Sequence, residues 1–234
     1  MNNHKKSINF ITLTNSGYID FTLNCLKSLE LSNCNRNLVS YCIGKRGHEL
    51  LIENGHKSIL LDNQNCTDEF CNTGDGKINS IWRRKFHIIH ENLLSSEYVL
   101  FTDSDVVFEN SMFIDYLLNN INKQDLLIQN DIRSDEPACS GFMFIKSTSA
   151  TLDLFHPKHT EKFKDCTWWG DQTYVNQILH KLNHKKLPLE LFPNGKFYYN
   201  NFNKINPYII HFNWVEGKHK KSKMKQYKKW LLID

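Results

Sequence analysis

Short apolar runs that alternate with stretches of helical periodicity constrain the fold of this chain more than any other sequence feature. Strand-like runs occupy residues 8–14, 38–43 and 58–61, and helical patterns at 22–31 and 49–54 separate them. Strands that are joined through a helix pair in parallel, and the helix then covers one face of the sheet. The start of the chain therefore predicts an α/β fold.

The rest of the chain continues the same alternation. A longer amphipathic helix is predicted from residue 79 to 93, and the apolar run that begins at residue 98 predicts a strand directly after it. Further elements are expected as strands at 126–129, 141–146 and 208–212 and a helix at 171–181. Without an internal repeat or a linker rich in Gly, Pro or Ser, the chain is expected to form a single domain over residues 1–234.

The composition excludes several classes of protein. The apolar fraction of 40%, with 15 Phe, 9 Tyr and 5 Trp, is too high for a disordered chain. No apolar run reaches the ~20 residues of a membrane helix or resembles a signal-peptide core, so we expect a cytoplasmic protein. The 7 cysteines include no C-x-x-C pair, which favours reduced thiols over a zinc site or a disulfide framework.

Two carboxylates interrupt the predicted strand in the segment FTDSDVVF, residues 101–108. Ligands of open α/β sheets bind beyond the carboxyl ends of the strands, which is where Asp103 and Asp105 fall. Side chains two residues apart in extended backbone point to the same side, so the two carboxylates repel each other unless a cation lies between them. Mn²⁺ or Mg²⁺ suits such oxygen ligands, although Asp and Ser are also common in plain turns.

Cationic residues occur at two places from which they can reach these carboxylates. Arg83, Arg84 and Lys85 fan around the predicted helix, so one of them is expected to face the sheet edge. The run at 209–214 places His211 and Asn213 on one side, and His211 is either a third metal ligand or a hydrogen-bonded core histidine. Seven lysines between residues 217 and 229 then form a loop or tail that holds a diphosphate, contacts nucleic acid nonspecifically or is simply solvated.

Six segments, in this order, resemble the DxD-containing nucleotide-diphospho-sugar glycosyltransferases of the GT-A fold and, more distantly, the glycogenin-like transferases. They are LTNSGY (13–18), K-F-x-I-I-x-E-N-L (85–93), YVLFTDSDVVF (98–108), SGFMFIKST (140–148), GDQTYVNQIL (170–179) and IHFNWVEGKHKK (210–221). The resemblance implies a Rossmann-like, mixed but mostly parallel sheet flanked by helices. It also implies a nucleotide-binding half at 1–108 and, at 109–234, an acceptor half with a C-terminal metal- and phosphate-binding segment.

The resemblance implies roles for particular residues of this chain. Asp103, Asp105 and His211 would hold Mn²⁺ (or Mg²⁺), and Asp171 and Gln172 would be the catalytic pair. Residues expected to contact the donor are Thr14, Asn15, Tyr18, Lys85, Ser104, Asn213, Gly217, Lys218 and Lys221. Residues expected on the acceptor side are Asp131, Ser140, Gly141, Trp168 and Trp169, and the two tryptophans suit the core equally well.

The reaction that the resemblance implies is transfer of a sugar from a nucleotide-diphospho-sugar, with UDP as the expected nucleotide, to a glycan or another hydroxyl acceptor. The resemblance favours retention at the anomeric carbon, whereas the sequence leaves the stereochemistry open because it depends on where a carboxylate lies. Two other enzyme classes stay open: a metal-dependent phosphohydrolase with D-x-D, and a nucleotidylyltransferase. A non-enzymatic nucleic-acid-binding domain that uses the lysine-rich tail is the third alternative.

Overall fold

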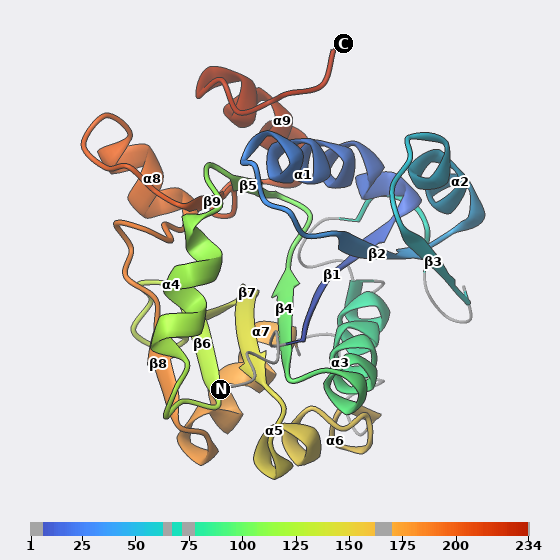
Figure 1. The fold of residues 1–234 in the computed structure, drawn as a ribbon. Helices are drawn as coiled ribbons and strands as arrows, with labels where there is room; N and C mark the ends of the chain where they lie inside the picture. The colour runs from blue at the N-terminus through green and yellow to red at the C-terminus, as the bar shows by residue number, and fades with distance from the viewer. Residues whose placement is uncertain (1–6, 63–66, 72–77, 162–169, 234) are drawn as a thin grey trace.

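A seven-stranded mixed sheet forms the centre of the computed structural model, which describes residues 7–62, 67–71, 78–161 and 170–233. Its strand order is β3-β2-β1-β4-β7-β6-β8 (Figure 1). Five of its strands are β1 (Ile8–Asn15), β2 (Leu38–Ile43), β3 (Ser58–Leu61), β4 (Tyr98–Thr102) and β6 (Leu126–Asn130). The others are β7 (Ala138–Lys146) and β8 (His184–Lys186). β1 to β4 pair in parallel and β8 is parallel to β6, whereas β7 runs antiparallel to both β4 and β6. The expected α/β architecture with a mixed, mostly parallel sheet is confirmed.

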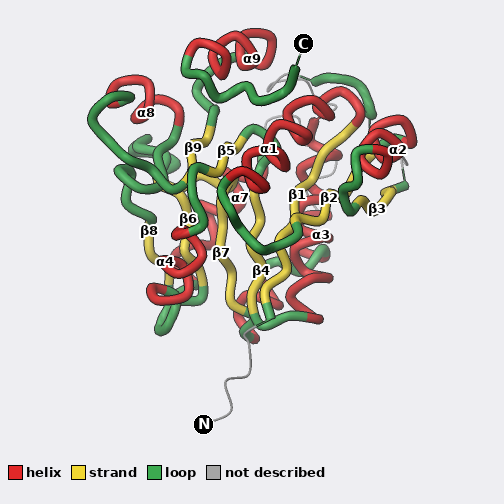
Figure 2. Tube along the Cα trace, turned by 45° about the horizontal axis from the view of Figure 1, so that its top comes forward, coloured by secondary structure: helices red, strands yellow, loops and turns green. Residues whose placement is uncertain are grey.

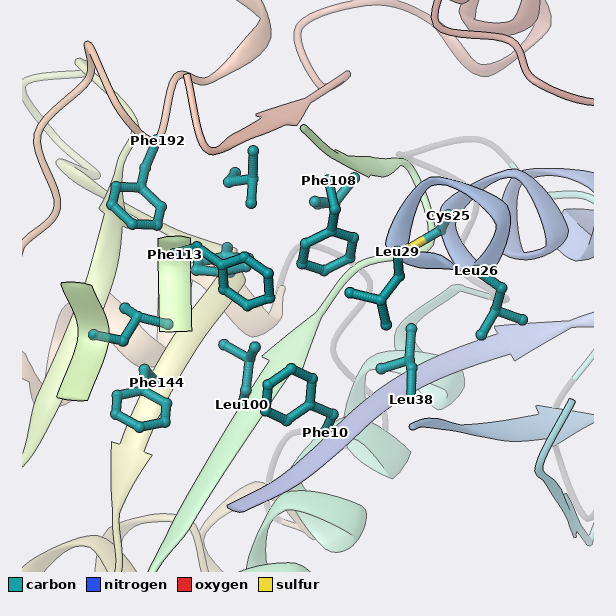
Figure 3. Packing of buried hydrophobic residues seen from close by; sticks show 14 of the residues in the cluster. Phe10, Cys25, Leu26, Leu29, Leu38, Leu100, Phe108, Phe113, Phe144 and Phe192 are labelled. Atoms are coloured by element: carbon teal, nitrogen blue, oxygen red, sulfur yellow. The ribbon is translucent and has the colours of Figure 1, made fainter. Parts of the chain in front are cut away.

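Helices cover both faces of this sheet. Side chains of α1 (Ile19–Leu31), α2 (Lys45–Glu53) and α4 (Met112–Asn120) share one apolar cluster with strand residues such as Phe10 and Leu100. Figure 3 shows this cluster, in which Leu26 and Leu29 of α1 lie over the sheet. The opposite cluster joins α3 (Ile78–Ser95), α5 (Ser149–Leu154) and α7 (Asp171–Ile178) to the alternate strand residues. Successive side chains of a strand point to opposite faces, so strands buried on both sides are apolar throughout.

A small second sheet brings the C-terminal part of the chain back to the centre of the molecule. β5 (Val106–Phe108) pairs antiparallel with β9 (Ile209–His211), and Val106 lies opposite His211. A third apolar cluster packs α1 and these strands against α8 (Gly195–Asn201) and α9 (Gly217–Gln226), which lie at the same end of the molecule (Figures 1 and 2). Asn24 of α1 accepts from Leu231 N at 2.6 Å and donates to Lys229 O at 3.0 Å, which fixes the chain after α9.

The lysine-rich segment differs from its expected conformation. Residues 217–226 form helix α9 instead of a loop or an unstructured tail. Lysine is a good helix former, which favours a helix in this segment. Met224 and Tyr227 pack in the third cluster and hold the helix against the rest of the protein. The remaining helix α6 (Lys158–Glu161) and the turns at Ser16–Tyr18 and Leu179–Lys181 complete the described elements. Among the described helices, none has both the length and the apolar character needed to cross a bilayer.

Candidate active site

The two aspartates of the D-x-D motif lie in a tight connection between two sheets. β4 ends at Thr102 and β5 begins at Val106, so the motif occupies the link between them. Main-chain hydrogen bonds hold the link on both sides: Asp103 N donates to Gly141 O at 2.7 Å, and Phe212 N donates to Asp105 O at 3.0 Å. The Asp103 side chain is 38% exposed, whereas that of Asp105 is 8% exposed. One carboxylate therefore faces the open site and the other lies in its wall.

His211 completes a cluster of three groups able to bind a metal ion. The β5–β9 pairing places its Nε2 atom 3.1 Å from Asp105 Oδ1 and 3.8 Å from Asp103 Oδ2. Ligand atoms of the three residues all lie within 4.8 Å of one another. A Cβ atom at Gly141 would fall 2.6 Å from Asp103 Oδ2 and 2.3 Å from His211 Cε1, so only glycine leaves these groups free to converge. Two carboxylates and one imidazole form a donor set suited to a divalent ion such as Mn²⁺.

A buried glutamine orients the imidazole. Gln129 Oε1 lies 2.7 Å from His211 Nδ1, and Gln129 Nε2 donates to the main-chain oxygens of Phe192 at 3.2 Å and Pro193 at 2.9 Å. The two carbonyl acceptors determine which end of the Gln129 amide faces the ring. His211 Nδ1 must therefore carry the proton that it donates to Oε1, and Nε2 is directed toward the carboxylates. Such contacts to the distant ring nitrogen are typical of metal-binding histidines.

Lys220 of α9 forms an ion pair with Asp105 inside the site. Its Nζ lies 2.5 Å from Asp105 Oδ2. Burial by itself raises the pKa of Asp105, but Lys220 and then His211 outweigh burial and hold that pKa well below its usual range. Burial likewise lowers the pKa of His211, and the neighbouring Asp105 carboxylate reverses this and raises the pKa well above its usual value. Asp105 is thus the electrostatic anchor of both cationic groups.

Lys85 of α3 is the cationic residue that reaches the sheet edge. Its Nζ contacts Asp103 Oδ1 at 3.2 Å and Asp171 Oδ2 at 2.5 Å, and it lies 4.3 Å from the centre of the Phe101 ring. Burial favours neutral Lys85, yet the two carboxylates overcome it and raise its pKa above the usual value. Ser140 also donates to Asp171 Oδ2, at 2.8 Å. Asp171 itself is the first residue of α7, where the helix dipole favours a carboxylate.

These groups line one cavity of about 590 Å³ at the carboxyl end of the parallel strands. Thirteen of the predicted site residues line it, namely Thr14, Asn15, Tyr18, Lys85, Asp103, Ser104, Asp105, Ser140, Gly141, Asp171, Gln172, His211 and Asn213. Sequence reasoning did not identify Trp82, Arg133, Glu136, Cys139 and Lys220, which line the cavity as well. Predicted residues from distant segments are therefore brought together, and the cavity has the size of a small-molecule site.

Two residues that were predicted to contact the sugar donor, Asn15 and Tyr18, hold residues 67–71 in place. The side-chain amide of Asn15 accepts from Tyr18 N at 3.1 Å and donates to the main-chain oxygens of Thr67 at 3.2 Å and Glu69 at 2.7 Å. Tyr18 donates from its hydroxyl to Cys71 O at 2.8 Å. The two side chains thus fix residues 67–71 against the end of β1, which shapes this wall of the cavity.

The remaining predicted residues have other locations. Gly217 begins α9, and Lys221 lies over the Trp230 ring at 4.6 Å, outside the cavity lining. Trp168 and Trp169, together with the side chain of Lys218, lie outside the described residues. Lys220, which sequence reasoning passed over, holds the position beside the aspartates. Its signal was its place three positions after Gly217, and only the helical conformation of α9 shows which lysine faces inward.

Asp131 does not project a free carboxylate toward the cavity. Its Oδ1 accepts from Trp214 Nε1 at 2.9 Å, and its Oδ2 accepts from Arg133 Nε at 2.8 Å and Gln172 Nε2 at 3.0 Å. The residue is 3% exposed. Asp131 was predicted to contact the acceptor, and in this structure its contacts connect the residues of that wall.

The strand order, the acidic motif after β4 and the histidine on β9 together define the GT-A fold of the glycosyltransferases. The galactosyltransferase LgtC, solved in complex with donor and acceptor sugar analogues, superposes with a TM-score of 0.64 at 11% identity over 97% of each chain. The glycosyltransferase GlyE of Streptococcus pneumoniae superposes with a TM-score of 0.59 at 16% identity, over 98% of this chain and 62% of that one. At such identities the likeness concerns the fold alone.

Residues 36–226 match the family model described as nucleotide-diphospho-sugar transferase, and the chain belongs to this family. A curated relative is the UDP-galactose:fucoside alpha-3-galactosyltransferase of Dictyostelium discoideum, which is 25% identical over an alignment that covers 98% of this chain. The chain spans 44% of that relative's length.

Proposed function

We propose that this chain transfers a sugar from a UDP-sugar to a hydroxyl group of a glycan, with retention, and that the reaction depends on a divalent ion, Mn²⁺ or Mg²⁺. The observation that carries the proposal is the convergence of Asp103, Asp105 and His211 in the same cavity as Lys85 and Asp171. Family membership and the relative named for UDP-galactose support the choice of donor.

Departure of the nucleotide creates negative charge on the diphosphate, and the site is equipped to balance it. A bound divalent ion would act as a Lewis acid on that diphosphate. Lys220, which pairs with Asp105 in this structure, is the residue that we propose to contact the leaving phosphates, in place of Lys218 and Lys221. Thr14, Tyr18, Ser104 and Asn213 line the same cavity and are proposed to hold the nucleoside and its ribose.

Positive charge develops on the sugar at the same time, and Asp171 is suited to stabilise it. The Asp171 carboxylate is fixed through Oδ2 by Lys85 and Ser140, so its position does not depend on the substrate. We propose that Asp171 acts electrostatically on the anomeric carbon, because a preorganised charge needs no rearrangement during the reaction. Gln172, the next residue of α7, is proposed to orient the sugar. Retention needs a stabiliser or nucleophile on the face opposite the leaving group, and we propose Asp171 for that place.

The contacts of lysines in and just after α9 argue against a nucleic-acid-binding domain. Lys220 pairs with Asp105, Lys221 lies over Trp230, Lys223 lies 4.8 Å from the centre of the Tyr199 ring, and Lys229 contacts Glu109 at 2.5 Å. Lysines used in this way do not form a free cationic strip for phosphates of a nucleic acid. We therefore assign the lysine-rich segment to the fold and to the donor site.

The deciding experiment measures release of UDP or GDP from a panel of nucleotide-sugars without an acceptor. Mn²⁺ should support release from at least one UDP-sugar, UDP-galactose being the first to test, and a chelator should suppress it. Asp103→Asn is the matched variant, because it keeps the shape of the side chain and removes its charge. Release that persists with the chelator, or equal release by Asp103→Asn, would refute the metal-dependent reaction.

A further inference from the structure

We infer that Trp214 is the stacking platform of an acceptor subsite that takes a sugar ring, and that Asp131 is the positioning residue that locks this platform to the catalytic wall. The inference deepens the proposed function and rests on it. It assigns the residues that bind and orient the sugar ring of the glycan acceptor.

Trp214 has the exposure and the tethering of a ligand platform. The residue is 43% exposed, although tryptophan is usually well buried, and it follows Asn213, which lines the cavity. Its indole N–H is held by Asp131, so the ring has a fixed orientation. Lys196 Nζ lies over one face of the ring, 4.8 Å from its centre, so the opposite face is the one that we propose for stacking. An ordered, exposed indole presents a large apolar surface at little entropic cost to a ligand.

The backbone is strained at Trp214 and at the residue that follows Asp131. Trp214 has a φ of 60° and Ile132, the neighbour of Asp131, has a φ of 61°. Left-handed backbone is unfavourable for bulky and β-branched side chains, and it persists where the surroundings enforce it. Both residues are exposed, Trp214 at 43% and Ile132 at 40%. The two strained positions therefore flank the buried Asp131 carboxylate, whose partners Arg133 and Gln172 line the cavity.

Asp131 connects the platform to the residues next to the reacting atoms. Through Oδ1 it holds Trp214, and through Oδ2 it holds Arg133 and Gln172. Gln172 follows Asp171, the carboxylate proposed to stabilise the sugar. A shift of the indole is thus transmitted through the Asp131 carboxylate to Gln172 and Asp171. Asp131 therefore acts as a positioning residue.

Polar groups on the adjoining wall match the hydroxyl rim of a sugar. Arg133 and Glu136 contact each other and line the cavity, and Thr173 donates to Glu136 Oε1 at 2.6 Å. Planar guanidinium and carboxylate groups bind neighbouring hydroxyls in pairs, while the polarised C–H groups of a sugar face favour the negative face of an indole. An apolar platform beside converging polar groups fits a carbohydrate better than an extended peptide.

The test measures transfer from the UDP-sugar that the wild-type chain hydrolyses to methyl glycosides of galactose, glucose, xylose and fucose. Trp214→Ala should raise the acceptor KM by about tenfold or more, the effect of truncating a well-packed aromatic anchor, while the donor KM changes far less. Trp214→Phe keeps an aromatic face and should raise the acceptor KM by a smaller factor. Asp131→Asn places a side-chain NH2 group against the N–H groups of Arg133 and Gln172, which then lose their acceptor. This variant should therefore have a higher acceptor KM and also a lower kcat. Phe202→Ala, which truncates an aromatic residue that is 38% exposed and whose ring packs against Tyr198 and Tyr227, is the matched control.

Three results would overturn the inference. One is an unchanged acceptor KM in Trp214→Ala. Another is transfer to a hydroxyl-bearing peptide but to none of the glycosides. The third is loss of UDP binding in both Trp214 variants, because this would show that the indole is needed for folding and not for binding the acceptor. Each of these leaves nucleotide-sugar hydrolysis by the wild-type chain in place, whereas failure of the proposed function would abolish that hydrolysis itself.

Discussion

Gln129 lies 2.7 Å from His211 Nδ1 and thereby fixes which ring nitrogen faces the two aspartates. The two residues come from β6 and β9, which belong to different sheets. Gln129 is held in turn by the main-chain oxygens of Phe192 and Pro193. The orientation of the imidazole is therefore set by the fold before any ion binds.

Replacing Gln129 with leucine should weaken binding of Mn²⁺ by about 10- to 100-fold, because the imidazole loses its orienting acceptor. Isothermal titration calorimetry with the metal alone measures this affinity. Gln124→Leu, a change of the same residue type in the turn after α4, is the control and should bind as the wild-type chain does. A Gln129→Leu protein that folds and keeps the wild-type affinity would contradict the role given to Gln129.

Alanine at either aspartate should abolish metal-dependent release of UDP, but only one of the changes should destabilise the fold. Asp105→Ala leaves Lys220 and His211 without their buried carboxylate, which should cost on the order of 3 kcal/mol of unfolding free energy. Asp103→Ala should lower the unfolding free energy by less than about 1 kcal/mol. Asp103 is partly exposed, and Lys85 still has its ion pair with Asp171 in this variant.

Urea denaturation measures the two unfolding free energies, and Asp115→Ala on the exposed side of α4 supplies the baseline for losing a surface acid. Equal unfolding free energies for the two site variants would show that Asp105 is not the anchor of the buried cations.

Gly141→Ala should disrupt the metal site without straining the backbone. Gly141 lies in β7 and is not among the glycines with positive φ, so alanine is acceptable to the main chain. The added methyl group would fall 2.6 Å from Asp103 Oδ2 and 2.3 Å from His211 Cε1, which forces the ligand side chains apart. We expect weaker Mn²⁺ binding in calorimetry, together with a far-ultraviolet circular dichroism spectrum like that of the wild-type chain. Wild-type metal affinity in this variant would mean that the three ligands do not converge as described.

Lys220→Ala should weaken UDP binding in the presence of Mn²⁺ by about tenfold, as expected for the loss of a charge-assisted contact. Lys221→Ala is the matched change, because the neighbouring lysine of the same helix lies over Trp230 instead. We expect it to change UDP affinity by less than about threefold. A larger loss in Lys221→Ala than in Lys220→Ala would reverse the assignment.

Much of the fold follows from local pattern. Residues 38–43 and 58–61 have the predicted strand boundaries, and the long helix before β4 was expected within two residues of its observed start. Their periodicity is strong because each element buries a defined face. Helices α4, α5, α6, α8 and α9 and strand β8 were not predicted, since short or polar elements depend on contacts with distant residues for their stability.

The sequence by itself determined the chemistry of the site: an acidic pair after a buried strand, a histidine far along the chain, and lysines behind it. Only the tertiary structure decided that Lys220 is the lysine beside Asp105, that Gln129 orients His211, and that Asp131 holds Trp214. The physical reason is that a run of residues shows which side chains share a strand face, whereas partners from different elements meet only through packing. The α9 contacts and the β5–β9 pairing therefore carry information that no local pattern contains.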